Sequence, residues 1–269
     1  MVRQKISNRT KVAWMVLSVV IMVLGYSYLS YSQHVKNPLD ATIPSWGQMY
    51  DGMLNAMVKQ ENSYDGGWLL TDLTATGIRI FFGFLFSVIG GVLLGVLMGS
   101  SDHIKAFLTF PVAIGTNTPP TVVVAIFFIV VGIGLKFHMA VLLLGIIPSL
   151  TMGVNLVFRE FPDELKHKAY MLGNSNFEVI ERNFKFSLPK IIENVRAQVG
   201  NTIIFLMASE MQLSAEGMGY RIRLHSKIPD MAVVYPYLFL LILLGYLFKL
   251  FLKQSIDWVS PWFNLKEEK

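Results

Sequence analysis

Long apolar runs recur along this chain of 269 residues and constrain its fold more than any other feature. A helix needs ~20 mostly apolar residues to cross the hydrocarbon core of a bilayer. Only 15% of the residues are charged, against about 25% in a soluble domain. The sequence therefore predicts an all-α integral membrane protein. It contains no cysteine, which excludes disulfides, thiolate catalysis and cysteine-based metal sites.

Six segments are long and apolar enough to be predicted as transmembrane helices. Proline interrupts the third segment, and polar residues begin the fifth. The predicted spans are Val12–Tyr31, Leu73–Gly99, Phe107–Ile133, Met139–Phe158, Ile191–Leu213 and Met231–Leu252.

Basic residues predict the orientation, because Lys and Arg are enriched on the cytoplasmic side. Arg3, Lys5, Arg9 and Lys11 precede the first span, so we expect both termini of a six-span chain to be cytoplasmic. The outer loop 32–72 then has an excess of acids, with Asp40, Asp51, Glu61, Asp65 and Asp72 against Lys36 and Lys59. The basic residues Arg221, Arg223 and Lys227 are an exception, since they would lie outside. An alternative is that the first apolar run is a cleaved signal peptide, although its length and its flanking residues do not favour this.

The charged stretch 159–189 between the fourth and fifth spans has the pattern of a helical hairpin. Leu165, Ala169 and Leu172 recur at helical spacing, and Gly173 is typical of a helix end. Ser175 and Glu178 have the spacing of a capping box that starts a second helix. Pro189 follows at a place where the helix of the next span can begin. The hairpin is either a surface element or a docking element for a cytoplasmic partner.

Polar and small residues within the spans mark candidate functional positions. Gly83, Ser87, Gly91, Gly95 and Gly99 have the spacing that allows close helix packing, which we expect to occur within one subunit. The break at Pro119 and Pro120 either lines a translocation path or is a kink whose freed backbone groups are satisfied by neighbouring helices. The candidate lining residues of a translocation path are Thr116, Asn117, Thr118, Pro119, Pro120, Ser149, Asn155, Asn201 and Thr202.

Glu210 is the one carboxylate deep in an apolar run. A charge at that depth costs ~2.5–3.5 kcal/mol on insertion scales, so Glu210 is expected to face the bundle interior or the outer interface. Arg79 lies near the end of its span, where its side chain is expected to extend toward the membrane surface.

Four motifs, in order along most of the chain, resemble the permease subunits of ABC importers. They are "LTATGIRIFFGFLFSVIGGVLLGVLMG", "TNTPPTVVVAIFFIVVGIG", the hairpin "PDELKHKAYMLG" with "FSLP", and "ASEMQLSAEGMGY". The resemblance is to the branch that imports nitrate, sulfonates, taurine, bicarbonate and some vitamin precursors. Two departures are that His167 stands where the family's Glu is usual and Lys168 where its first Ala is usual. About three extra residues also separate Gly173 from Pro189.

The resemblance implies a type I permease bundle in a bacterial inner membrane, paired with a second permease subunit as a homodimer. It further implies cytoplasmic ATP-binding subunits, a periplasmic or lipid-anchored solute-binding protein, and a small, polar, anionic solute. The resemblance also implies a gating or structural role for Arg79, Glu210, Gly217 and Gly219. The residues implied to couple to the ATPase are Glu164, Leu165, His167, Lys168, Ala169, Leu172, Gly173, Phe177, Leu188 and Pro189.

The sequence carries no phosphate-binding loop, zinc-protease motif or nucleophile elbow. We therefore expect no catalytic residues, no cofactor, no metal site and no nucleic-acid partner. Two other readings remain open. The chain could be a secondary transporter or channel that works without an ATPase, or a membrane anchor without a pathway.

Overall fold

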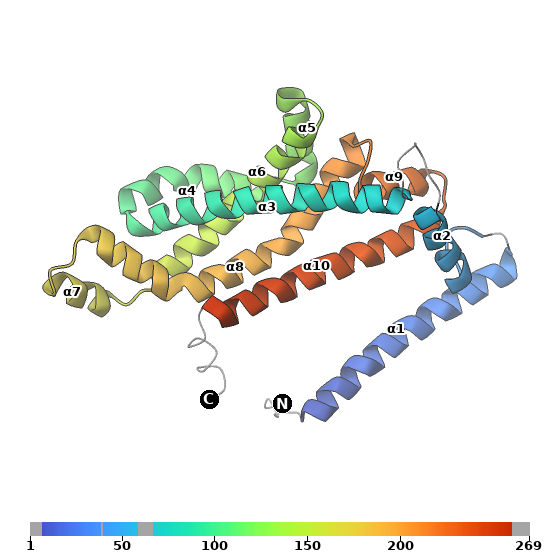
Figure 1. The fold of residues 1–269 in the computed structure, drawn as a ribbon, viewed down its shortest axis with the longest axis horizontal. Coiled ribbons are helices and arrows are strands. Elements are labelled where there is room, and N and C mark those ends of the chain that lie inside the picture. The colour runs from blue at the N-terminus through green and yellow to red at the C-terminus, as the bar shows by residue number, and fades with distance from the viewer. Residues whose placement is uncertain (1–6, 39, 59–66, 260–269) are drawn as a thin grey trace. The chain divides into compact units, whose positions relative to one another are not determined.

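A computed structural model of the chain describes residues 7–38, 40–58 and 67–259. Its helices are α1 (Asn8–Lys36), α2 (Trp46–Val58), α3 (Trp68–Ser100), α4 (Asp102–Asn117), α5 (Pro120–Val131), α6 (Leu135–Arg159), α7 (Asp163–Met171), α8 (Asn176–Leu213), α9 (Met218–Lys227) and α10 (Met231–Val259). The all-α fold predicted from the sequence is confirmed (Figure 1). Arg3 and Lys5, on which the predicted orientation partly depends, lie outside the described residues.

Four described helices are long and apolar enough to cross a membrane: α1, α3, α6 and α10. The pair α4 and α5 adds a fifth if it is counted as one span. The helix α8 contains the predicted fifth span but does not qualify, because charged and amide residues such as Glu193, Arg196 and Gln198 interrupt its apolar sequence. The count of six spans therefore stays a prediction.

The chain divides into two compact units, residues 1–68 with 224–237 and residues 69–223 with 238–269. In the first unit, the segment after α1 folds back along the end of that helix. The Tyr26 hydroxyl donates a hydrogen bond of 2.6 Å to the Pro44 carbonyl, and the Tyr26 ring packs edge-on against Trp46 of α2. Gly52 allows α2 to approach the start of α10 closely, because a Cβ at residue 52 would lie 2.5 Å from the Ala232 carbonyl oxygen. The helix α2 was not predicted from the sequence.

The core of the second unit lies where α6 packs between α3 and α8. Its buried apolar residues are Ile80, Phe84, Leu142, Ile146, Leu150, Val154, Val157, Ile191, Val195, Val199 and Leu206.

The small residues of α3 make its contact with α6 close. A Cβ added to Gly91 would lie 2.8 Å from Leu150 Cδ2, and one added to Gly95 would lie 2.5 Å from Val154 Cβ. The Thr151 hydroxyl also donates to the Gly91 carbonyl at 3.3 Å. The predicted role of this glycine series, helix packing within one subunit, is confirmed.

The predicted third span is two helices rather than one. The axes of α4 and α5 differ by 106° across the break at Thr118 and Pro119. Pro119 and Pro120 fit this break because proline lacks an N–H donor and disfavours a helical residue before it. Figure 1 shows α5 turning away from the direction of α4.

Candidate functional site

A buried ionic cluster joins α3, the end of α8 and the start of α9 in the second unit. The Arg79 guanidinium donates to Glu210 at 2.8 Å. Glu210 is fully buried and also accepts the Thr76 hydroxyl at 3.0 and 3.1 Å and the backbone N–H of Gly219 at 2.9 Å. A buried carboxylate requires this number of donors, because an unpaired charge away from water is unstable.

The loop between α8 and α9 supplies the backbone part of the cluster. Gly217 has φ of +110°, and a Cβ there would lie 2.7 Å from Arg79 Nη1 and 2.8 Å from the Glu210 carboxyl carbon. Only glycine fits such a conformation and approach. The N–H of Gly217 donates to Asp72 at 2.9 Å, and Asp72 also accepts from Arg221 Nε at 2.9 Å.

The four residues predicted to have a gating or structural role thus meet at one place. The prediction that Arg79 reaches the membrane surface is wrong, since its side chain is buried and paired. Glu210 compensates the charge of Arg79 inside the bundle, so the Arg79 side chain has no need to extend toward the membrane surface.

Sequence reasoning missed Asp72, Thr76 and Arg221. Asp72, Thr76 and Arg79 recur at i, i+4 and i+7, so they share one helix face, and this spacing could have identified the cluster. Asp72 had been assigned to the outer loop, but it lies in α3 and is fully buried.

Two of the three basic residues that disagreed with the predicted orientation, Arg221 and Arg223, have structural roles, and the third, Lys227, is exposed. Arg221 pairs with Asp72, and Arg223 donates to the Gln212 carbonyl at 2.7 Å and to the Ser214 carbonyl at 3.4 Å. These bonds within the second unit explain the positions of Arg221 and Arg223 without reference to a membrane side.

A second polar cluster connects α6 and α8 around Gln198. The Gln198 side-chain oxygen accepts hydrogen bonds from Ser149 at 2.8 Å and from Asn201 at 2.9 Å. Thr202 is buried and donates to the Gln198 backbone carbonyl. Asn155 is buried one turn or more away and accepts from Arg159. The structure thus brings together three of the predicted path residues, and Gln198 was not among them.

The remaining predicted path residues lie at the break between α4 and α5. Thr116, Asn117 and Thr118 donate to backbone carbonyls one turn earlier in α4. Of the three acceptors, the Ile114 carbonyl is among the last four of α4, which have no N–H partner within the helix.

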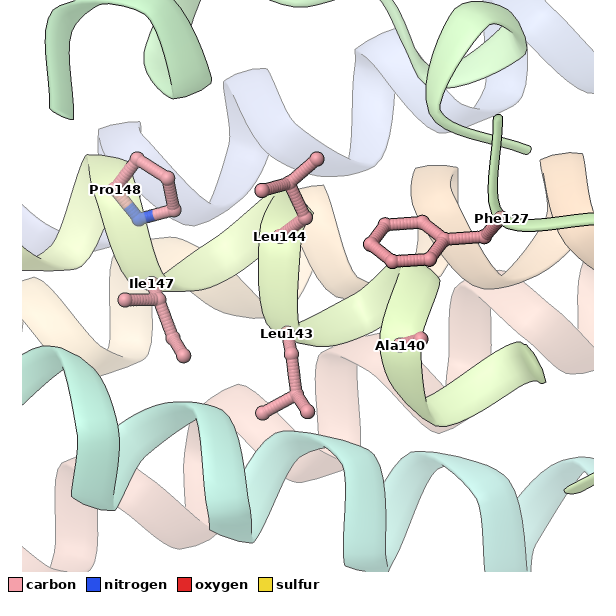
Figure 2. A pocket seen from close by; sticks show the side chains of 6 residues that line it. All are labelled: Phe127, Ala140, Leu143, Leu144, Ile147 and Pro148. Atoms are coloured by element: carbon pink, nitrogen blue, oxygen red, sulfur yellow. The ribbon is translucent and has the colours of Figure 1, made fainter. Parts of the chain in front are cut away.

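The described residues also line an open apolar cavity of about 260 Å³ beside α5 and α6. Figure 2 shows Phe127 of α5 above α6, with Leu144 and Pro148 on the same side of that helix. The lining is apolar throughout, so this cavity offers no partner to a polar solute.

The hairpin predicted between the fourth and fifth spans has the expected turn. Gly173 ends α7 with φ of +82°, and the N–H of Asn174 donates to the Ala169 carbonyl at 3.2 Å. Ser175 and Glu178 form the predicted capping box at the start of α8. The Ser175 backbone N–H, followed by its hydroxyl, holds the pKa of the Glu178 carboxyl below its usual value.

The expected restart of the helix at Pro189 is wrong. The helix α8 continues without interruption from Asn176 to Leu213, with Pro189 inside it. Proline removes one backbone donor there, and the residue four positions earlier, Lys185, is exposed, so water can satisfy its carbonyl.

Most of the residues predicted to contact an ATPase are exposed, and Ala169 and Pro189 are buried. Apolar side chains are exposed among the charges of the hairpin: Met171 is 89% exposed and Phe177 74%. The exposed predicted residues are Glu164, Leu165, His167, Lys168, Leu172, Gly173 and Phe177, and Leu188 is half-buried.

The described residues hold no group of three His, Cys, Asp or Glu side chains that could bind a metal ion. The buried charges of the second unit pair with each other instead. Apolar helices of spanning length and a broken helix pair together define a polytopic helical membrane protein.

Comparisons with known proteins identify the family. Residues 91–264 match the family described as binding-protein-dependent transport system inner membrane component, and the chain belongs to this family. It is a multi-pass inner-membrane permease subunit of an ABC importer, which implies ATP-binding partners.

One relative is the formylaminopyrimidine transport permease protein ThiX of Halalkalibacterium halodurans, 26% identical over 194 residues. The match covers 71% of this chain and 77% of that protein.

Solved structures share the fold. A chain of the inward-facing MetNI methionine ABC transporter matches with a TM-score of 0.63 and 19% identity, covering 72% of this chain and 96% of that one. A second crystal form matches with a TM-score of 0.57 and 18% identity, covering 81% and 100%.

Proposed function

We propose that this chain forms the translocation pathway of an ATP-driven importer and couples to a separate ATPase through the hairpin of α7, Gly173 and the start of α8. The observation that carries the proposal is the exposed apolar group Leu165, Met171, Leu172 and Phe177 among charged residues. Exposed apolar patches with a polar rim are typical of protein contact sites. Because α8 continues from the hairpin into the core, a push on the hairpin would move the helix that carries Gln198 and Glu210.

The pathway in this proposal passes the polar cluster of Ser149, Gln198 and Asn201, with the α4–α5 break beside it. Polar residues within spans are expected where a path or the bundle interior requires them. Two copies of the chain would enclose the path. A periplasmic or lipid-anchored binding protein would deliver the solute, and both termini and the hairpin would be cytoplasmic.

The solute in this proposal is small, polar and anionic, as in the nitrate, sulfonate, taurine and bicarbonate branch. Its size agrees with the small formylaminopyrimidine named for the relative ThiX. Selection of the solute would rest largely with the binding protein.

The test is association with the ATPase and solute uptake in hairpin variants. Met171→Ala and Phe177→Ala should each weaken ATPase binding by about five- to thirtyfold, the effect of truncating a contact hot spot. Gly173→Asp, which forces a side chain into a left-handed turn, should abolish coupling while the bundle still inserts. Glu181→Gln, which removes an exposed ion pair with Lys185 in the same helix α8, is the control. Wild-type association and uptake in all three hairpin variants would overturn the proposal.

A further inference from the structure

A cavity of about 420 Å³, open to the surface and lined mostly by apolar residues, lies beside the buried ionic cluster, within the second unit. It is bounded by the start of α6, by α3 and by the loop after α8. Its polar side chains are Arg79, His138, Ser214 and Glu216. Arg79 and His138 are more than nine-tenths buried, whereas the Glu216 side chain is 55% exposed.

The hydrogen bonds of His138 define what it can offer to a ligand. The Ser209 hydroxyl has one proton, which it donates to the Leu206 carbonyl at 2.8 Å. His138 Nδ1 lies 2.9 Å from the same hydroxyl oxygen and is the donor in the tautomer that we assign from the Ser209–Leu206 hydrogen bond. In the neutral ring this leaves Nε2 as a hydrogen-bond acceptor.

Arg79 provides the opposite kind of group. Its Nη1 is engaged by Glu210 at 2.8 Å and by the Glu216 carbonyl at 2.9 Å. Its Nη2 has only a long contact of 3.4 Å to the half-exposed Glu216 carboxylate, so another acceptor can replace Glu216 there. The N-terminal end of α6, with Gly134 and Leu135 lining the cavity, adds a positive potential.

We infer that this cavity binds the transported solute through a planar polar group that carries an oxygen acceptor next to an O–H or N–H donor. The acceptor replaces the Glu216 carboxylate on Arg79 Nη2, and the donor bonds to His138 Nε2. The inference rests on the proposed transport function and narrows its solute class. A group with acceptors only would leave the lone pair of His138 Nε2 facing another lone pair.

Hydrogencarbonate and nitrate are matched probes, because both are small, planar and singly charged, and they differ in one O–H donor. Formamide is a neutral probe with the same donor and acceptor. The assay is the ¹⁵N resonance of His138 Nε2 in the full chain labelled at histidine, purified in a detergent without phosphate, at constant pH. His138→Gln assigns the resonance among the five histidines.

We expect hydrogencarbonate or formamide to shift this resonance saturably, with nitrate at least about tenfold weaker because it leaves a buried acceptor unpaired. Glu216→Gln should tighten hydrogencarbonate binding by about two- to fivefold, since it removes a half-exposed competing ion pair. Glu181→Gln removes a comparable exposed pair on α8 and should change nothing.

Nitrate binding as tight as hydrogencarbonate, or no saturable shift with any of the three probes, would overturn the inference. The ATPase is absent from this assay, so the two proposals fail separately. A chain that binds the ATPase but none of the probes loses only the inference. A chain that binds a probe and no ATPase loses the proposed function.

Discussion

The buried pair Arg79–Glu210 gives the sharpest prediction about stability. In Glu210→Gln, a neutral amide replaces the carboxylate that accepts from Arg79, Thr76 and Gly219. The amide NH₂ would face the Gly219 N–H or the Arg79 guanidinium, so at least two donors would oppose each other. Removing one partner of a buried ion pair costs about 3–5 kcal/mol. The weaker contact of Arg79 with Glu216 at 3.4 Å places the expected loss toward the lower end.

The assay is thermal unfolding of the purified protein in detergent, followed by tryptophan fluorescence. We expect the melting temperature of Glu210→Gln to fall by roughly 6 °C or more, from about 2–4 °C per kcal/mol in proteins of this size. The double variant Arg79→Met with Glu210→Leu should recover part of this loss, because it leaves no charge unpaired, although the Thr76 hydroxyl and the Gly219 N–H lose their acceptor. Glu181→Gln, in an exposed pair, should cost less than about 1 kcal/mol. A Glu210→Gln protein as stable as this control would refute the reasoning.

Two further predictions concern helix packing and the hairpin. Gly95→Ala should destabilise the protein by about 1–3 kcal/mol, because the added Cβ overpacks against Val154. Gly77→Ala in the same helix is the control and should be neutral or stabilising, since a Cβ there meets nothing within 4 Å. Equal melting temperatures of the two variants would contradict this prediction. Ser175→Ala should fray the start of α8, with a loss of about 1 kcal/mol visible as faster amide exchange. The pKa of Glu178 is lowered in the folded protein, so its contribution to the stability of the fold is fully present above its unfolded pKa and is lost as the pH falls through the folded pKa. An NMR titration that finds the Glu178 carboxyl at its ordinary pKa would contradict this assignment.

Features set by a local stretch of sequence could be predicted. The apolar blocks of α3 and α6 are long enough that composition alone predicts a helix. The hairpin turn was readable because Gly173 and the pair Ser175 and Glu178 are adjacent signals for a helix end and a helix start. The close packing of α3 on α6 followed from glycine spacing.

Features that depend on partners distant in the sequence could not be predicted. The bond from Arg221 to Asp72 joins residues 149 positions apart, and neither sequence neighbourhood indicates the other. For a similar reason the burial of Arg79 could not be predicted, because its partner Glu210 lies 131 positions away in the sequence. Pro189 was misread because one proline usually ends a helix, whereas packing of Ile191, Val195 and Val199 in the core holds α8 continuous.

Native mass spectrometry of the tagged chain, purified from its host in mild detergent, tests the central claim most directly. The account predicts two copies of this chain with two copies of a nucleotide-binding ATPase, and loss of the ATPase alone in Gly173→Asp. A stable monomer or homo-oligomer of the wild-type chain without any ATPase would contradict the proposed coupling.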